Sequence, residues 1–436
     1  MEKLDLKRKK LPITRDELEK LSKNELIDKI IQINAHNTQL INIINKNSTN
    51  GQNESFFKKG QKPFDFSKAH YRHILLKLYY LGWDYKGFAC QEDSTETIEH
   101  YLFDALIKTC LIKDRNSSNY HRCGRTDKGV SAFCQVISIN VRSKFDKNEQ
   151  NNEESLKDEI EYCKLLNKVL PKQIQCIAWC PLQNEEFSAR FDCESRTYKY
   201  FFPKSQLNIE AMQKACKFFI GTHDFRNFCK LDVANGVTEY IRNVIDISID
   251  ESNENNKNST YNMYVLKITG KAFVWHQIRC IMSILLLIGE EKEQPEVIKD
   301  LLNVDYVPKK PQYVLASDLP LNLYNCQYNI DENQWIYKSD ALKHSICCLQ
   351  QSWCENAVKA SMVQTMINDL VEQYNNYCKA TDTETDSNES LYKQHELLLA
   401  KESQSKIYQP LLQRKTCESL ENRITHFNKK RKTYNL

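Results

Sequence analysis

The middle of the chain alternates between strand-like and helix-like patterns of apolar residues. Residues 74–80 (ILLKLYY) alternate apolar with polar positions, which is typical of a half-buried strand. Apolar residues then recur at helical spacing from Thr95 to Thr109, which predicts a helix. This part of the chain therefore has the β-α-β-α-β order of a first α/β unit. Its later elements are predicted as a strand with Ile137, Ile139 and Val141 on one face, a helix over Leu156–Leu170 and a strand over Ile174–Cys180.

A second series of elements repeats this alternation. Residues 273–288 (FVWHQIRCIMSILLLI) are apolar nearly all round, so they predict the most buried helix of the chain. The polar exceptions in this helix are His276, Gln277 and Arg279. Another predicted helix, Ile209–Ile220, ends at Gly221, the position after a helix where left-handed backbone is tolerated. The strands of this unit are predicted over Arg196–Phe202, Ile241–Ile249, Met263–Ile268 and Leu321–Tyr328.

Both ends of the chain have helical patterns of their own. A capping box at 14–17 and apolar residues at three-four spacing predict a helix over Thr14–Asn45. This pattern fits a short coiled coil and fits equally well a helix that docks on its own domain. Residues 46–62 are polar and Asn-rich, which indicates a linker. A helix is also predicted over Ser345–Tyr377, and the basic run at 426–432 (HFNKKRK) is more often a solvated tail than a nuclear-import or nucleic-acid patch.

These elements predict an α+β fold with two similar α/β halves, mainly antiparallel sheets and helices on one face. We expect residues 1–62 to form the N-terminal helix and linker, and residues 63–186 to form a first half that carries the turn described below. Residues 187–330 should form the second half, and residues 331–436 a helical C-terminal extension with a basic tail.

Composition narrows the class of protein only modestly. The net charge of +4 is mild, and by itself it does not predict nucleic-acid binding. The 17 cysteines include no CxxC pair, so a zinc ribbon is not expected and reduced thiols are the simpler interpretation. No apolar run approaches the length of a membrane span, and no secretory leader is evident. We therefore expect a soluble intracellular protein that does not enter a membrane.

The most distinctive polar stretch is the glycine-bounded turn at 124–129 (GRTDKG), which runs directly into an apolar strand. A carboxylate such as Asp127 in this setting is usually a turn residue that bonds its own backbone. Here Arg125 and Lys128 flank it, and we expect them to lower its pKa and keep it ionised. Arg279 in the predicted buried helix needs an anionic partner, and Asp127 is a candidate.

The remaining motifs favour RNA over small-molecule chemistry. The chain has no Walker loop, no GxGxxG, no HExxH and no zinc-deaminase signature. An oriented aspartate can act as a nucleophile or stabilise a cationic sugar-like centre. The run at 187–202 (FSARFDCESRTYKYFF) interleaves cations with aromatic residues, a mixture that suits phosphates and unpaired bases. The alternative is a strand with core aromatics, which we prefer for Tyr200 and Phe202, and Tyr198 shares their face.

The segment Gly124–Ala132 (GRTDKGVSA) resembles the signature of the TruA family of tRNA pseudouridine synthases. Within that family the chain looks most like the eukaryotic branch that modifies positions 38 and 39 of the tRNA anticodon stem-loop. Bacterial members more often have Ala after the aspartate and His at the position of Ser131. Five further segments resemble the family in the same order along the chain: 80–91 (YLGWDYKGFACQ), 166–171 (LNKVLP), 187–200 (FSARFDCESRTYKY), 221–228 (GTHDFRNF) and 272–282 (AFVWHQIRCIM).

The resemblance implies a role for each candidate site residue. Asp127 would be the catalytic aspartate, paired with Arg279, and Arg125 would assist flipping of the target base. Tyr198 would stack on the uracil, and Lys128 and Arg196 would complete the substrate-binding set. The reaction would cut the N-glycosidic bond of a uridine, turn the base in the pocket and rejoin it through carbon. The family needs no metal and no cofactor.

The resemblance also implies partners and leaves alternatives open. Family members are typically homodimers whose basic cleft holds tRNA, so we expect a homodimer that binds tRNA. We expect the protein to be located in the nucleus, the cytoplasm or both. One alternative is a TruA-type enzyme that acts on other uridines in tRNA, small nuclear RNA or messenger RNA. Another is an RNA-binding module of RRM-like topology without activity, which would not need Asp127 and its neighbours.

Overall fold

The computed structural model describes residues 64–92, 94–233, 236–252, 262–381, 394–399 and 408–434. The chain divides into two compact units, Met1–Asp65 and Phe66–Leu436, and every element described below belongs to the second. The helix predicted over Thr14–Asn45 and the linker at 46–62 lie outside the described residues. Within the described ranges, the search for a helix long and apolar enough to cross a membrane finds none.

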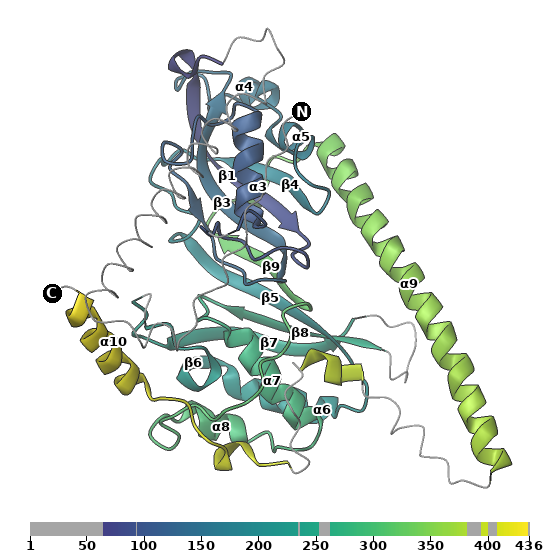
Figure 1. The fold of residues 1–436 in the computed structure, drawn as a ribbon. Coiled ribbons are helices and arrows are strands. Elements are labelled where there is room, and N and C mark those ends of the chain that lie inside the picture. The colour runs from purple at the N-terminus through teal and green to yellow at the C-terminus, as the bar shows by residue number, and fades with distance from the viewer. Residues whose placement is uncertain are drawn as a thin grey trace, which may run out of the picture. The chain divides into compact units, whose positions relative to one another are not determined.

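One nine-stranded sheet runs through the second unit (Figure 1). Its strands lie in the order β4-β1-β3-β9-β5-β8-β7-β6, and β2 pairs with β3. Among the strands of the described residues, all pairings are antiparallel except the parallel pairing of β3 with β9. The expected separate sheets are thus a single sheet, because β9 pairs with β3 on one side and with β5 on the other. The strands are β1 (His70–Tyr80), β2 (His121–Arg122), β3 (Ser131–Ser143), β4 (Ile174–Pro181), β5 (Cys193–Pro203), β6 (Gly221–Asp224), β7 (Ile241–Glu251), β8 (Met263–Gly270) and β9 (Leu321–Tyr328).

Two hydrophobic cores lie along this sheet. The first gathers apolar residues of β1, β3 and β4 with helix α3 (Ile98–Lys108). The second gathers β5, β7 and β8 with helices α6 (Ile209–Cys216), α7 (Gln277–Gly289) and α8 (Val297–Leu302). The strands and helices that the apolar spacing predicted are confirmed at these places, apart from the two helices discussed next.

The single helix predicted over Leu156–Leu170 is wrong. The chain forms two short helices instead, α4 (Glu153–Asp158) and α5 (Tyr162–Asn167), and between them the backbone at Glu159 is extended. The buried Glu159 carboxylate accepts hydrogen bonds from Arg72 (2.9 Å), from the Ser143 hydroxyl (2.6 Å) and from the Lys144 amide (2.9 Å). A buried charge must be satisfied in this way, and these bonds draw the chain out of the helical path.

Helix α7 begins later than the sequence predicted, at Gln277 rather than at residue 273. The reason is His276, whose backbone is left-handed with φ 61° and therefore cannot continue a helix toward the N-terminus. This conformation costs about 1–2 kcal/mol for a residue with a Cβ. The prediction that this helix is deeply buried is confirmed, since every residue of α7 except Arg279 is buried.

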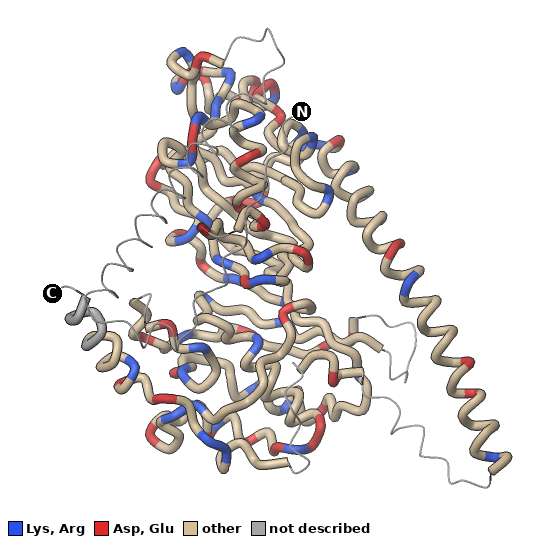
Figure 2. Tube along the Cα trace, in the orientation of Figure 1, with Lys and Arg blue, Asp and Glu red and all other residues tan. Residues whose placement is uncertain are grey.

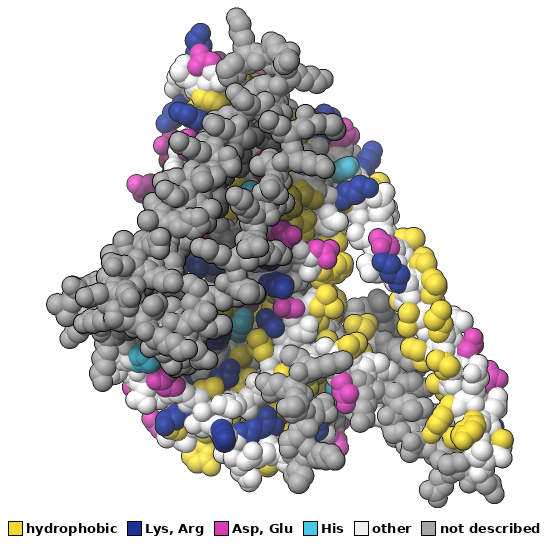
Figure 3. Space-filling view, in the orientation of Figure 1, with side chains coloured by type: hydrophobic (Ala, Val, Ile, Leu, Met, Phe, Trp, Pro, Cys, Tyr) yellow, Lys and Arg dark blue, Asp and Glu magenta, His cyan; other side chains and the backbone are white. Residues whose placement is uncertain are grey.

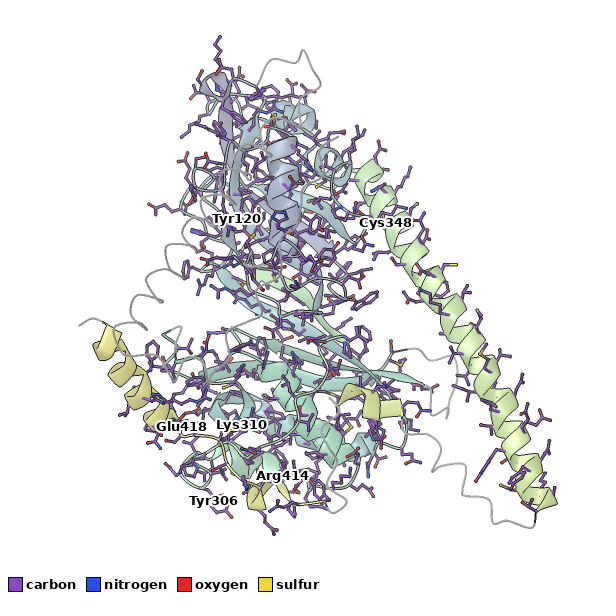
Figure 4. All side chains as sticks on the ribbon, viewed as in Figure 1. Tyr120, Tyr306, Lys310, Cys348, Arg414 and Glu418 are labelled. Atoms are coloured by element: carbon purple, nitrogen blue, oxygen red, sulfur yellow. The ribbon has the colours of Figure 1, made fainter. Side chains whose placement is uncertain are left out.

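The helix predicted over Ser345–Tyr377 is confirmed and is longer at both ends, as α9 (Ser339–Ala380, 42 residues). Its first turns pack beside β4, where Ala341 and Cys348 are buried (Figure 4). Other large apolar side chains on this helix are exposed, and Figure 3 shows hydrophobic side chains along much of its length. These exposed residues are Ile346, Trp353, Val358, Met362, Val363, Met366, Leu370 and Tyr377.

The described segments after α9 return to the second core. Leu398, Leu411 and Leu420 are buried within that core. Helix α10 (Leu420–Tyr434) is tied to it near its start by the ion pair between Arg226 and Glu421 at 3.1 Å. Part of the C-terminal extension therefore completes the second half of the sheet unit.

Candidate active site

The turn that carries Asp127 is clamped by the loop that follows β1. The Phe88 amide donates to the Thr126 carbonyl oxygen at 3.1 Å, and the Gly129 amide donates to the Tyr85 carbonyl oxygen at 3.2 Å. The hydroxyls of Tyr80 and Thr126 are 2.7 Å apart, within the core side of β1. Backbone contacts on both sides of Asp127 thus fix the position of its Cα.

Two glycines make this close approach possible. A Cβ on Gly82 would lie 2.0 Å from the Val130 carbonyl oxygen, a distance that real side chains do not reach. Gly87 has φ +99° and lies against the backbone of Thr126, so a side chain there would be strained. These glycines explain why the segment 80–91 accompanies the aspartate turn in the sequence.

A fully buried carboxylate, Glu99 of α3, fixes the chain that leads into the turn. It accepts from the Tyr120 hydroxyl at 2.7 Å, from the Cys90 amide at 2.9 Å and from the Arg122 guanidinium (Tyr120 is labelled in Figure 4). Burial alone would raise the pKa of Glu99, but these bonds together hold it below its usual value. Tyr120 and Arg122, just before Gly124, are therefore held in place by their bonds to the buried Glu99 carboxylate.

Arg196 braces the same chain from β5. Its guanidinium donates to the carbonyl oxygens of Cys123 (3.1 Å), Arg190 (3.0 Å) and Lys271 (2.6 Å), and more distantly to that of Cys193 (3.5 Å). In this structure its donors are thus directed at the backbone of Cys123, just before the turn, and of segments outside the turn. The substrate-binding role expected of Arg196 remains a prediction.

The carboxylate of Asp127 meets two side chains from the other half of the sheet unit. The indole nitrogen Nε1 of Trp275 donates to Oδ1 at 3.1 Å, and Nε2 of His276 lies 3.4 Å from Oδ2. The sequence marked His276 only as a polar exception in an apolar helix and did not single out Trp275. The signal was present in the motif at 272–282, but the turn that brings both side chains to one carboxylate is not visible in spacing.

Burial raises the pKa of Asp127 above its ordinary value, although the Arg279 and Lys230 cations and the Trp275 hydrogen bond oppose this shift. The neighbouring Asp318 carboxylate raises the pKa further. The expectation that Arg125 and Lys128 would lower the pKa is therefore wrong. Both side chains point to solvent, and neither forms a hydrogen bond or ion pair with another described residue.

Arg279 lies close enough to act on Asp127 electrostatically, but the expected direct ion pair is not formed. Its Nε donates to the Ala316 carbonyl oxygen at 2.7 Å, and its guanidinium lies 3.8 Å from the Asp318 carboxylate. Asp318 in turn packs against Gly129 at the end of the turn. The carboxylate beside the Arg279 guanidinium is therefore that of Asp318 and not that of Asp127, the partner predicted from the sequence.

Tyr198 lies where the two cores meet and packs against both. Its ring contacts Phe273 edge-on with centroids 5.3 Å apart, and burial raises the pKa of its phenol well above the usual range. Tyr200 and Phe202, which follow on the same face of β5, are fully buried, as predicted for core residues. Tyr198 is only partly buried, which distinguishes it from them.

Exposed cations surround the turn. Arg125 and Lys128 belong to the turn, and Lys230 places its ammonium 4.3 Å from the centre of the Trp275 ring. Arg190 and Lys271 are exposed. Their carbonyl oxygens accept hydrogen bonds from the Arg196 guanidinium, which also donates to the Cys123 carbonyl oxygen. Figure 2 shows lysine and arginine positions in both halves and close to the sheet between them. This rim is suited to a polyanion that reaches Asp127.

The site therefore combines a rigidly held carboxylate, an indole N–H bonded to one of its oxygens, an imidazole beside the other, a partly buried tyrosine and a basic rim. Among the described residues, no three His, Cys, Asp or Glu side chains are grouped so that they could hold a metal ion. An ionised aspartate in such surroundings can attack or stabilise an electrophilic sugar carbon.

A family model described as tRNA pseudouridine synthase matches residues 215–329. The chain is 40% identical over 430 residues to the tRNA pseudouridine(38/39) synthase of Mus musculus, covering 95% of this chain and 88% of that protein. It is 42% identical over 400 residues to the protein of the same name from Homo sapiens, covering 88% and 82%. It is 32% identical over 239 residues to the tRNA pseudouridine synthase A of Thermococcus onnurineus, covering 55% and 79%. The chain belongs to the TruA family of tRNA pseudouridine synthases.

Proposed function

We propose that this protein converts uridine to pseudouridine at positions 38 and 39 of the tRNA anticodon stem-loop. The similarity to relatives named for that activity extends over most of the chain. The observation that carries the mechanism is the geometry of Asp127, a carboxylate on a clamped turn that accepts a hydrogen bond from Trp275 and lies 3.4 Å from Nε2 of His276. This is an isomerisation, so the enzyme adds and removes no atoms overall.

In the proposed reaction the Asp127 carboxylate acts at the sugar carbon of the target uridine while the bond between that carbon and N1 breaks. The uracil turns within the site, and C5 forms the new bond to the sugar carbon. The proton on C5 is then lost and N1 gains one, which balances the reaction. Since the carboxylate must be ionised, the raised pKa of Asp127 sets the acid side of the activity range.

The other site residues take supporting roles in this proposal. Tyr198 would stack on the uracil, which suits a partly buried ring that is already held edge-on by Phe273. Arg125 would occupy the space left when the base leaves its helix, and Lys128 would contact the backbone phosphates, as their exposure allows. Arg279 would stabilise the ionised aspartate from α7, and Arg196 would contact substrate from β5.

Mapping of pseudouridine in unmodified tRNA, incubated with wild type and with Asp127→Asn, tests the proposal. We expect product at positions 38 and 39 from the wild type and none from the variant, with tRNA binding retained by both. Product from the Asn variant at the wild-type rate would contradict the mechanism. Product only at other uridines would instead support the alternative of a TruA-type enzyme with different targets.

We also propose a homodimer with two similar α/β halves per chain, residues 63–186 and 187–330. Support for the dimer comes from α9, where the exposed side chains of Val358, Met362, Met366, Leu370 and Tyr377 follow one another at spacings of four, four, four and seven positions and so share one face. Such a stripe on a helix with few charged residues suits contact with a second copy. For location we propose the nucleus, the cytoplasm or both, where tRNA is made and used.

A further inference from the structure

Two consecutive residues, Trp275 and His276, both direct their side chains at the carboxylate of Asp127. Trp275 Nε1 donates to Oδ1 at 3.1 Å, and His276 Nε2 lies 3.4 Å from Oδ2. Neighbouring side chains on a strand or a helix diverge, so this convergence needs an unusual backbone. His276 provides it with its left-handed φ of 61°.

The backbone around this pair is held independently of Asp127. The Val274 amide donates to Oε1 of Gln277 at 2.9 Å, and the Gln277 amide donates back to the Val274 carbonyl oxygen at 3.0 Å. The Lys230 amide donates to the Trp275 carbonyl oxygen at 3.0 Å. These bonds fix a strained turn at the start of α7, and strain that persists in this way is typical of functional sites.

We infer that Trp275 and His276 are positioning residues that hold the Asp127 carboxylate in one orientation by contacting its two oxygens from the opposite half of the sheet unit. The inference rests on the proposed function, in which that carboxylate acts on the target uridine. It assigns no contact with the RNA to either residue.

The charges that face this group make His276 suitable for the task. Burial, Arg279, Lys230 and Lys310 lower the pKa of His276 to about 4, so the ring is neutral near pH 7 (Lys310 is labelled in Figure 4). In the tautomer with the proton on Nε2, a neutral imidazole offers an N–H to Oδ2 without cancelling the negative charge. Arg279 and Lys230 also face Asp127, Asp318 is the neighbouring anion, and Arg125 and Lys128 lie on the turn itself.

Trp275→Phe removes the N–H and keeps an aromatic ring beside Lys230. We expect the rate at saturating tRNA to fall about 10- to 100-fold, the range for loss of a hydrogen bond to a charged group, with KM nearly unchanged. The acid limb of the pH–rate profile should move to higher pH, because the lost bond lowers the pKa of Asp127 in the wild type. Trp335→Phe, which alters an indole beneath Lys77 outside the site, is the matched control and should keep the wild-type profile.

His276→Gly separates positioning from folding. Glycine adopts the left-handed conformation without strain, so this variant should melt at or above the wild-type temperature and still lose at least tenfold in rate, about the lower limit for such a bond. Glu291→Gly is the matched control, since Glu291 has φ 58° just beyond the other end of α7. It should gain stability in the same way and keep full activity.

Asp127→Asn in the same assay separates the two possible failures. An active Asn variant would overturn the proposed function itself. If the Asn variant is inactive while Trp275→Phe and His276→Gly keep the wild-type rate and pH profile, only the positioning inference is wrong. It is also wrong if either variant changes KM alone, because that result would assign the residue to tRNA binding. Should Trp275→Phe melt early, the rate of the well-folded His276→Gly variant decides the question.

Discussion

Glu99 and Asp127 are carboxylates of the same half, and their environments shift their pKa values in opposite directions. Glu99 has several donors on its two oxygens, and its pKa lies below the usual value despite full burial. Asp127 has one close hydrogen bond, from Trp275, and its pKa is raised. The Glu99 carboxylate is saturated with hydrogen bonds that hold the fold, whereas the Asp127 carboxylate keeps lone pairs available for a reaction.

The raised pKa of Asp127 predicts a trade between stability and activity. A carboxyl whose folded-state pKa exceeds its unfolded value favours folding fully at pH below the unfolded value, and this contribution is lost as the pH rises through the folded value. At pH 7 the ionised group therefore opposes folding, and Asp127→Asn should raise the melting temperature. The gain should vanish below about pH 4, where both states carry a neutral group.

Thermal melts of wild type and Asp127→Asn between pH 3.5 and 8 check this (roughly the range that spans the ordinary carboxyl pKa). Asp114→Asn is the control, because hydrogen bonding to Ser117 holds the pKa of Asp114 below its usual range. That substitution should lower the melting temperature at neutral pH instead. A lower melting temperature for Asp127→Asn at pH 7 would contradict the prediction.

Tyr198→Phe tests whether the ring or the hydroxyl of Tyr198 matters for RNA. The substitution keeps the edge-on contact with Phe273 and the stacking face, so we expect most tRNA affinity to remain. Tyr198→Leu should weaken binding by about 1–3 kcal/mol, the range for loss of one stacked base. Fluorescence anisotropy with labelled anticodon stem-loop measures both. A large loss in the Phe variant would count against a stacking role.

At the scale of elements, the spacing of apolar residues predicted those helices and strands that are determined by their own local sequence. β9 was predicted with its observed bounds, and the burial of α7 followed from its apolar sequence. The helix over 156–170 failed because Glu159 is drawn to Arg72, a partner far away in the chain that spacing cannot show. The start of α7 failed for a related reason, since the left-handed His276 belongs to a turn that packs against Asp127. The family motifs identified Asp127, but its contacts with Trp275 and His276 needed the fold.

The exposed stripe of α9 predicts how the protein associates. Leu370→Glu places a charge within the stripe, so we expect the dimer to dissociate to a monomer with the helix intact. Asn368→Glu adds the same charge at an exposed position that has no stripe residue three or four positions away, so it should leave the dimer unchanged. Light scattering coupled to size-exclusion chromatography reports the mass of each variant. A wild type that is monomeric, or a Leu370→Glu variant that stays dimeric, would show that α9 is not the interface.

At the scale of the whole sheet unit, the site exists only because both halves contribute. Asp127 and its clamp come from the first half, and Trp275, His276 and Arg279 come from the second. The sequence pattern suggested separate sheets. It could not distinguish them from one continuous sheet, because β9 pairs with strands that are far from it in the sequence. The parallel pairing of Ser131 and Ala132 with β9 fixes the turn relative to the second half.

The basic rim predicts a measurable share of tRNA affinity. Lys271→Ala removes an exposed cation and leaves the carbonyl oxygen that Arg196 binds. We expect weaker tRNA binding and a salt dependence whose slope falls by about 1, as for one lost phosphate contact. Lys214→Ala, which removes an exposed cation on α6 paired with Glu296, should leave the slope unchanged. Titrations by anisotropy at several salt concentrations compare the two, and equal slopes for both variants would exclude Lys271 from the interface.

The central position of β9 also has a consequence for synthesis on the ribosome. This strand is made after every other strand of the sheet, yet it lies between β3 and β5 and supplies Leu323, Cys326 and Tyr328 to the first core. The first core therefore cannot be completed while the first half emerges. Ser131 and Ala132 of β3 and the β9-facing edge of β5 stay unpaired until β9 has left the ribosomal tunnel. Such long-range pairing folds slowly and exposes strand edges meanwhile, so the nascent chain should depend on chaperones until the sheet is complete.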